Sequence, residues 1–111
     1  MATLTVQPVA LGGAAVTTAA ASGGGDEFPN NGKTLYRVTN GGGSPITVTF
    51  TATGVLPSGA AIASVSAVSV AAGATKYFGP FPEQFFNNSN GRVAVTYSGV
   101  TSVTVAAISL P

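Results

Sequence analysis

The sequence predicts an all-β fold, a single β-sandwich of about seven short, mostly antiparallel strands with a flexible N-terminal arm. Two observations support this prediction. Apolar and polar residues alternate with a period of two in several segments, which is typical of half-buried strands. Clusters of Asn and Gly, such as Asn30-Asn31-Gly32, separate these segments and favour tight turns, because both residues tolerate positive φ.

The length of the chain predicts one structural domain. Its 111 residues lie near the commonest domain size. A chain of this size buries about two thirds of its surface, which is enough for one modest core. Within this domain we expect an N-terminal strand and flexible arm over residues 1–25 and a sandwich body over residues 26–111.

The individual strands are expected where the alternation is clearest. In residues 45–53, Ile46, Val48 and Phe50 are expected to face the core, and the threonines between them to face solvent. In residues 101–110 both faces are apolar, so the second face is expected to be covered as well. Further strands are expected over residues 3–9, 33–40, 61–70, 73–79 and 92–99.

The N-terminal region divides into a strand and a long connection. Residues 3–9 place Leu4 and Val6 on one face, and Pro8 indicates a sheet edge or a strand end. Residues 11–32 are long for a loop in a compact domain, and such loops are usually functional or disordered. We expect either a mobile surface loop or an arm that becomes ordered only against a neighbouring subunit.

Composition limits the classes of function. Only 6% of the residues are charged, whereas about 25% is typical. This indicates either a β domain that is rich in Ala, Thr and Gly and has no special role for its low charge, or a protein whose surface is largely covered by neighbours. The net charge is +1, and the chain has only four Lys and Arg residues, too few for the basic stripe that nucleic acid requires. We therefore expect no nucleic-acid partner.

The sequence also lacks the residues on which catalysis usually depends. It contains no Cys and no His, so disulfides, the commonest metal ligand and the usual general base are absent. Asp26 and Glu27 are adjacent and would point to opposite faces of a strand, and Glu83 is distant in sequence, so no carboxylate pair with a fixed separation is predicted. We expect no catalytic residue, no cofactor and no metal site, and therefore no enzyme.

The start of the sequence and its hydropathy predict where the chain acts. The stretch MATLTVQPVALGG has neither a basic n-region nor a long apolar run, unlike a secretory signal peptide. No segment approaches the roughly 20 apolar residues of a membrane span. We expect a protein made in the cytoplasm, without a membrane partner.

The stretch TKYFGPFPEQFF, residues 75–86, holds five of the nine aromatic residues. It could form a ligand-binding surface, a lid over an active site, or a structural corner that also meets a partner. A corner is favoured, because Gly79 and Pro80 end the preceding strand and residues 83–86 suit one helical turn. Such a corner buries two or three rings, so at least one of Phe81, Phe85 and Phe86 is expected at an interface. A sugar- or base-stacking platform is the alternative, but only Glu83 and Gln84 supply polar groups nearby.

Three stretches resemble small head decoration proteins, also called cement proteins, of tailed bacteriophages and prophages. They are NGKTLYRVTNGGGSPITVTFTA (31–52), VAAGATKYFGPFP (70–82) and NGRVAVTYSGVTSVTVAAISL (90–110). The likeness is carried by residues 31–34 leading into a strand, by residues 79–82 and by the hairpin at residues 97–101. It covers about residues 26–110 and does not extend to the arm.

The resemblance implies a protein of the virion, on the outer surface of the capsid, synthesised in the host cytoplasm. It implies binding to the major capsid protein, and self-association as a homotrimer or homodimer. Under this interpretation the N-terminal arm pairs with the sheet edge of a neighbouring subunit, and Leu4 and Val6 are expected to take part in this pairing. Phe81, Phe85 and Phe86 are expected to contact a partner.

Two further functions remain open at this point. A carbohydrate-binding or adhesive head-fibre module would display exposed, coplanar rings. A tail-tube or connector subunit would share the β-sandwich core, but such subunits usually carry more charge on the surface that lines the ring.

Overall fold

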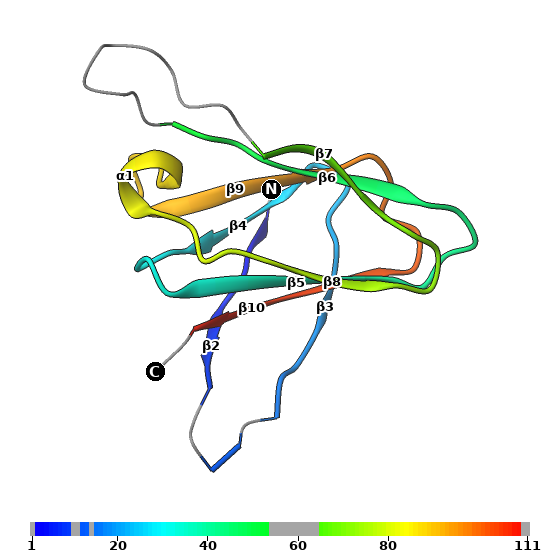
Figure 1. Ribbon diagram of the computed structural model, residues 1–111, viewed down its shortest axis with the longest axis horizontal. Coiled ribbons are helices and arrows are strands. Elements are labelled where there is room, and N and C mark those ends of the chain that lie inside the picture. Colours follow the sequence, from blue (N-terminus) through cyan, green and yellow to red (C-terminus); the bar gives the residue numbers. More distant parts are fainter. Residues whose placement is uncertain (1, 10–11, 14, 54–64, 110–111) are drawn as a thin grey trace.

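A computed structural model describes residues 2–9, 12–13, 15–53 and 65–109. In these residues the chain forms two five-stranded sheets and one short helix, so the predicted all-β class is confirmed. The molecule measures 43 × 35 × 20 Å. Figure 1 shows the two sheets one above the other, with α1 (Glu83–Phe86) at one end of the sandwich.

Sheet A has the strand order β1-β4-β9-β6-β7. Its strands are β1 (Ala2–Thr3), β4 (Asp26–Pro29), β9 (Arg92–Tyr97), β6 (Ile46–Phe50) and β7 (Val65–Val70). All neighbouring pairs are antiparallel except β1 and β4, which run parallel.

Sheet B has the order β2-β10-β5-β8, with β3 also paired to β10. Its strands are β2 (Val6–Pro8), β10 (Val103–Ser109), β5 (Thr34–Asn40), β8 (Thr75–Phe78) and β3 (Ala19–Ala20). β10 and β5 pair over their full length, from Val103↔Asn40 to Ser109↔Thr34. Along the other edge of β10, β2 runs parallel to its C-terminal half and β3 antiparallel to its N-terminal half.

The burial of side chains follows the predicted alternation. Ile46, Val48 and Phe50 are buried, while the threonines between them are partly exposed. The second face of β10 is covered as expected, because Ala106 and Ile108 are buried although they alternate with the inward-facing residues. Residues 61–64 of the predicted strand 61–70 lie outside the described residues.

Sequence reasoning missed β4, which lies in the segment expected to be a loop or an arm. The strand consists of two acids, a phenylalanine and a proline, and three of these four are poor strand formers. It forms because β9 pairs with it along one side and β1 along the other, and because Phe28 is completely buried. Parts of the expected arm therefore belong to the sandwich, namely residues 2–3, 6–8 and 19–20.

The core between the sheets is one cluster of aromatic and β-branched side chains. Phe28 stacks on Tyr36 with 4.7 Å between ring centroids, and this contact joins sheet A to sheet B. Phe50 meets Tyr36 edge-on at 5.6 Å from the opposite sheet. These ring contacts hold the two sheets together at a fixed separation.

Candidate interaction surface

The aromatic stretch 75–86 closes one end of the sandwich. Phe81 is only 3% exposed, and its ring lies 4.8 Å from that of Phe50 and 5.5 Å from that of Phe86. Phe78 lies 4.9 Å from Phe50 and is partly buried. The stretch therefore forms the structural corner, in which Phe81 and Phe86 are buried and Phe78 and Phe85 are partly buried against the core.

The three phenylalanines expected at an interface face the chain's own core to different degrees. Phe81 and Phe86 are buried in the core cluster, and Phe85 is half-buried against it. In this conformation neither Phe81 nor Phe86 presents a ring to a partner. Phe28 and Phe50 extend the apolar surface against which the rings of the corner pack.

Leu4 and Val6 both lie half-buried against the core, next to the edges that the N-terminal segment covers. The amide of Leu4 donates a hydrogen bond of 2.8 Å to the carbonyl of Glu27 in β4. Val6 is the register partner of Ala107 in β10. The N-terminal segment therefore connects an edge of sheet A to an edge of sheet B within one chain.

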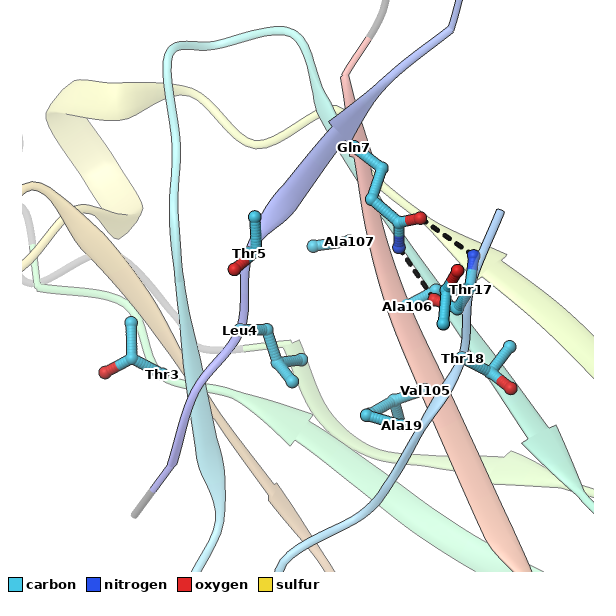
Figure 2. A pocket seen from close by; sticks show the side chains of 10 residues that line it. All are labelled: Thr3, Leu4, Thr5, Gln7, Thr17, Thr18, Ala19, Val105, Ala106 and Ala107. Carbon is cyan, nitrogen blue, oxygen red and sulfur yellow. Dashed lines mark hydrogen bonds between the residues drawn. The ribbon is translucent and has the colours of Figure 1, made fainter. Parts of the chain in front are cut away.

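An open groove of about 460 Å³ lies where β2 and β3 meet β10 (Figure 2). Val105, Ala106 and Ala107 of β10 form part of its lining. The Gln7 side chain closes one end, because its amide donates a hydrogen bond of 2.7 Å to the Thr17 carbonyl and accepts one of 2.8 Å from the Thr17 amide. The remaining lining side chains are mostly threonines and small apolar residues: Thr3, Leu4, Thr5, Thr18 and Ala19.

Beside this groove lies the outer face of sheet B, the face turned away from the core. Its members alternate with the core-facing residues of β10, β5 and β8 and form rows across the three strands. The members on β10, Ala106 and Ile108, are themselves buried. One row is Ala106, Arg37 and Tyr77, which are cross-strand register partners. The neighbouring rows contain Thr104, Thr39 and Thr75 on one side and Ile108 and Leu35 on the other.

Two residues distinguish this outer face. Tyr77 is 59% exposed and is the one exposed large apolar side chain in the described part of the protein. Arg37 is partly buried, and its Nε atom is buried without a hydrogen-bond partner. Sequence reasoning placed Tyr77 only within the aromatic stretch. Its alternation with Phe78, whose side chain faces the core, was the signal that could have identified it as outward-facing.

A polar chain crosses the core beside these rings. The Tyr97 hydroxyl donates a hydrogen bond of 2.7 Å to Oδ2 of Asp26, and the hydroxyls of Tyr36 and Tyr97 are hydrogen-bonded to each other. Asp26 is completely buried; its Oδ2 accepts a further bond from the Ser22 amide, and Oδ1 has no hydrogen-bond partner. Burial raises the pKa of both tyrosine hydroxyls far above their ordinary value, and the nearby Asp26 acts in the same direction.

Glu27 does not belong to this hydrogen-bonded row of Tyr36, Tyr97 and Asp26. Glu27 accepts a hydrogen bond of 3.0 Å from Arg92, which holds the pKa of the Glu27 carboxyl below its usual value. In the part of the chain that the structure describes, no three His, Cys, Asp or Glu side chains gather where they could hold a metal ion. No helix in the same residues is long and apolar enough to cross a membrane.

Comparison of this chain with known protein families, with curated proteins and with solved structures finds no match.

Proposed function

We propose that this chain is a structural protein of a tailed-bacteriophage virion, which binds the outer surface of the major capsid protein shell and stabilises it. The sequence resemblance over residues 26–110 suggests this role. The structural observation that carries it is the outer face of sheet B. Among the described strand residues that belong to this face, Arg37 is the one charged side chain.

Such a face suits contact with another protein better than contact with water. A lone soluble domain usually keeps a mixed, charged surface, because charge keeps it dispersed. The centres of protein interfaces, in contrast, are depleted in Lys, Asp and Glu and enriched in Tyr and Arg. The row of Ala106, Arg37 and Tyr77, flanked by threonines and by Leu35 and Ile108, has this composition.

The adhesive alternative receives less support from the arrangement of the rings. A glycan-stacking platform needs exposed rings that lie in one plane. All nine aromatic residues belong to the described part of the chain, and of these only Tyr77 is an exposed large side chain. Tyr77 is therefore a contact residue for a protein partner in the proposed function.

Self-association belongs to the same proposal. Subunits that occupy symmetry axes of a shell are expected to form closed oligomers, here a homotrimer or homodimer. Light scattering on a sizing column measures the solution mass directly. A stable dimer or trimer supports this part of the proposal, and a monomer at all concentrations contradicts it.

Rebinding to shells tests the principal claim. Particles of the phage or prophage that encodes this chain are prepared without it, incubated with the purified protein and sedimented. We expect saturable cosedimentation at a fixed ratio to the major capsid protein, together with improved survival of the particles on heating. Absence of cosedimentation over the whole concentration range would rule out decoration.

A further inference from the structure

We infer that the outer face of sheet B docks an acidic segment of a different protein, with Arg37 as the charge partner of a carboxylate and Tyr77 as the neighbouring aromatic contact. The inference deepens the proposed function and rests on it only for the identity of the partner. The four cationic side chains of the protein differ in their surroundings.

Arg37 differs from the other cations of the chain. Arg92 is paired with Glu27 at 3.0 Å, Lys76 donates a hydrogen bond of 3.1 Å to the Ser69 carbonyl, and Lys33 is exposed to solvent. Arg37 is partly buried, and no acid among the described residues pairs with it. A buried Nε–H without an acceptor is a cost to the free protein. A carboxylate docked on the guanidinium would supply the charge-assisted hydrogen bonds that this side chain lacks.

The surroundings of Arg37 suit a docked chain. Tyr77 on β8 and Ala106 on β10 are its register partners, so an exposed ring lies on one side and a small, buried side chain on the other. Ala106 also lines the groove between β2 and β3, which makes the groove continuous with this row. Neighbouring strands lie about 4.8 Å apart, so the row from Tyr77 to Ala106 spans about 10 Å, the scale of a few residues of extended chain.

The small number of free acidic side chains indicates whether the partner at Arg37 is a second copy of this protein or a different protein. The three acids of this chain are Asp26, which is buried, Glu27, which is paired with Arg92, and Glu83, which is exposed. A second copy could therefore offer only Glu83 without losing an existing contact. With so few acids of its own, the face is better matched by a partner that supplies the carboxylate.

Two synthetic peptides test this inference with the full-length protein. One carries a central Leu-Asp-Leu sequence in a Gly-Ser background, and its twin carries Asn in place of Asp. Amide chemical shifts are followed by NMR during titration. We expect the Asp peptide to shift the amides of Arg37, Tyr77 and Ala106, with an affinity at least about tenfold above that of the Asn peptide and weakened by salt, as for a charged pair at an interface.

Matched variants locate the effect. Arg37→Gln is expected to reduce binding of the Asp peptide to that of the Asn peptide, whereas Lys33→Gln, which removes an exposed cation, leaves it unchanged. If Arg37→Gln does not fold, Arg37→Lys serves instead, and binding weakens because lysine cannot form the bidentate pair. No shifts on this face, equal binding of both peptides, or shifts at other sites overturn the inference.

Shell binding separates the inference from the proposed function. If the wild-type protein and Arg37→Gln decorate shells equally well, the proposed function stands and the role of Arg37 is overturned. Wild-type protein that fails to bind shells but binds the Asp peptide at Arg37 would overturn the function and support the acidic docking face.

Discussion

The hydroxyl of Tyr97 donates a hydrogen bond of 2.7 Å to the fully buried carboxylate of Asp26, and both residues belong to sheet A. Tyr36 of sheet B is hydrogen-bonded to the same Tyr97 hydroxyl. Each hydroxyl has a single hydrogen to donate. Because Tyr97 donates its hydrogen to Asp26, Tyr36 must donate to Tyr97, and the chain runs in one direction from sheet B to the carboxylate.

Removal of the central hydroxyl is expected to destabilise the sandwich. Tyr97→Phe leaves the Tyr36 hydroxyl without an acceptor and removes one of the two donors to Asp26. We expect the free energy of unfolding to fall by about 1–3 kcal/mol, the cost of buried polar groups that lose a partner. Urea unfolding followed by circular dichroism measures the change.

Tyr77→Phe is the matched control, because it deletes the same atom from an exposed ring. We expect its free energy of unfolding to stay within about 0.5 kcal/mol of the wild-type value. Equal effects of the two substitutions would mean that the buried chain contributes nothing specific to stability.

Stability is expected to fall at alkaline pH because of the same two tyrosines. The pKa of Tyr36 and that of Tyr97 are raised by burial from an ordinary value of 10.0. Above pH 10 the unfolded chain releases these protons while the folded chain retains them. The stabilisation is therefore complete below pH 10 and is lost as the pH rises further, by about 1.4 kcal/mol per pH unit for each tyrosine.

A double variant isolates this contribution from that of lysine and arginine. Between about pH 9 and pH 11, we expect the free energy of unfolding of the wild type to decrease more steeply than that of Tyr36→Phe with Tyr97→Phe. Parallel slopes for the two proteins would show that these hydroxyls do not titrate differently on unfolding.

Gly79 is expected to tolerate no side chain. Its φ is +109°, and a Cβ atom there would lie 2.8 Å from the carbonyl oxygen of Thr34. Gly79→Ala is therefore expected to reduce the free energy of unfolding by about 1–3 kcal/mol. Thermal unfolding of Gly43→Ala provides the comparison, because a Cβ at Gly43 meets nothing within 4 Å. Similar melting temperatures of the two variants would contradict the crowding at Gly79.

Gln7 is expected to hold the N-terminal segment in place by acting as donor and acceptor together. Gln7→Glu keeps the acceptor for the Thr17 amide but replaces the donor by an oxygen that faces the Thr17 carbonyl. We expect faster hydrogen exchange at the Thr17 amide and little change in the core strands. Unchanged exchange at Thr17 would show that these two bonds do not hold the segment.

Most of the sandwich could be predicted because its longer strands carry their own pattern. β5 and β6 alternate regularly between buried and partly exposed residues, and β10 shows its covered second face directly in the sequence. β4 could not be predicted in this way, because it holds one apolar side chain and depends on its neighbours β1 and β9. The same holds for β3, whose two alanines form a strand only against β10.

The interaction surface was harder to predict from the sequence than the strands were. The sequence predicts that the aromatic stretch forms a corner, and the structure confirms this. The sequence does not show that the rings of Phe28 and Phe50 pack against that of Phe81. The pairing of Arg37 with Tyr77 joins strands that are distant in sequence, and the register alone reveals it. The absence of an acid beside Arg37 likewise depends on where Glu27 and Glu83 lie in three dimensions.

Cryo-electron microscopy of shells re-decorated with the purified chain tests the proposed function most directly. We predict sandwich-shaped density on the outer surface of the shell, with the outer face of sheet B against the major capsid protein and Arg37 next to an acidic side chain. Shells that remain bare, or density that contacts the shell through sheet A while sheet B faces solvent, would contradict it.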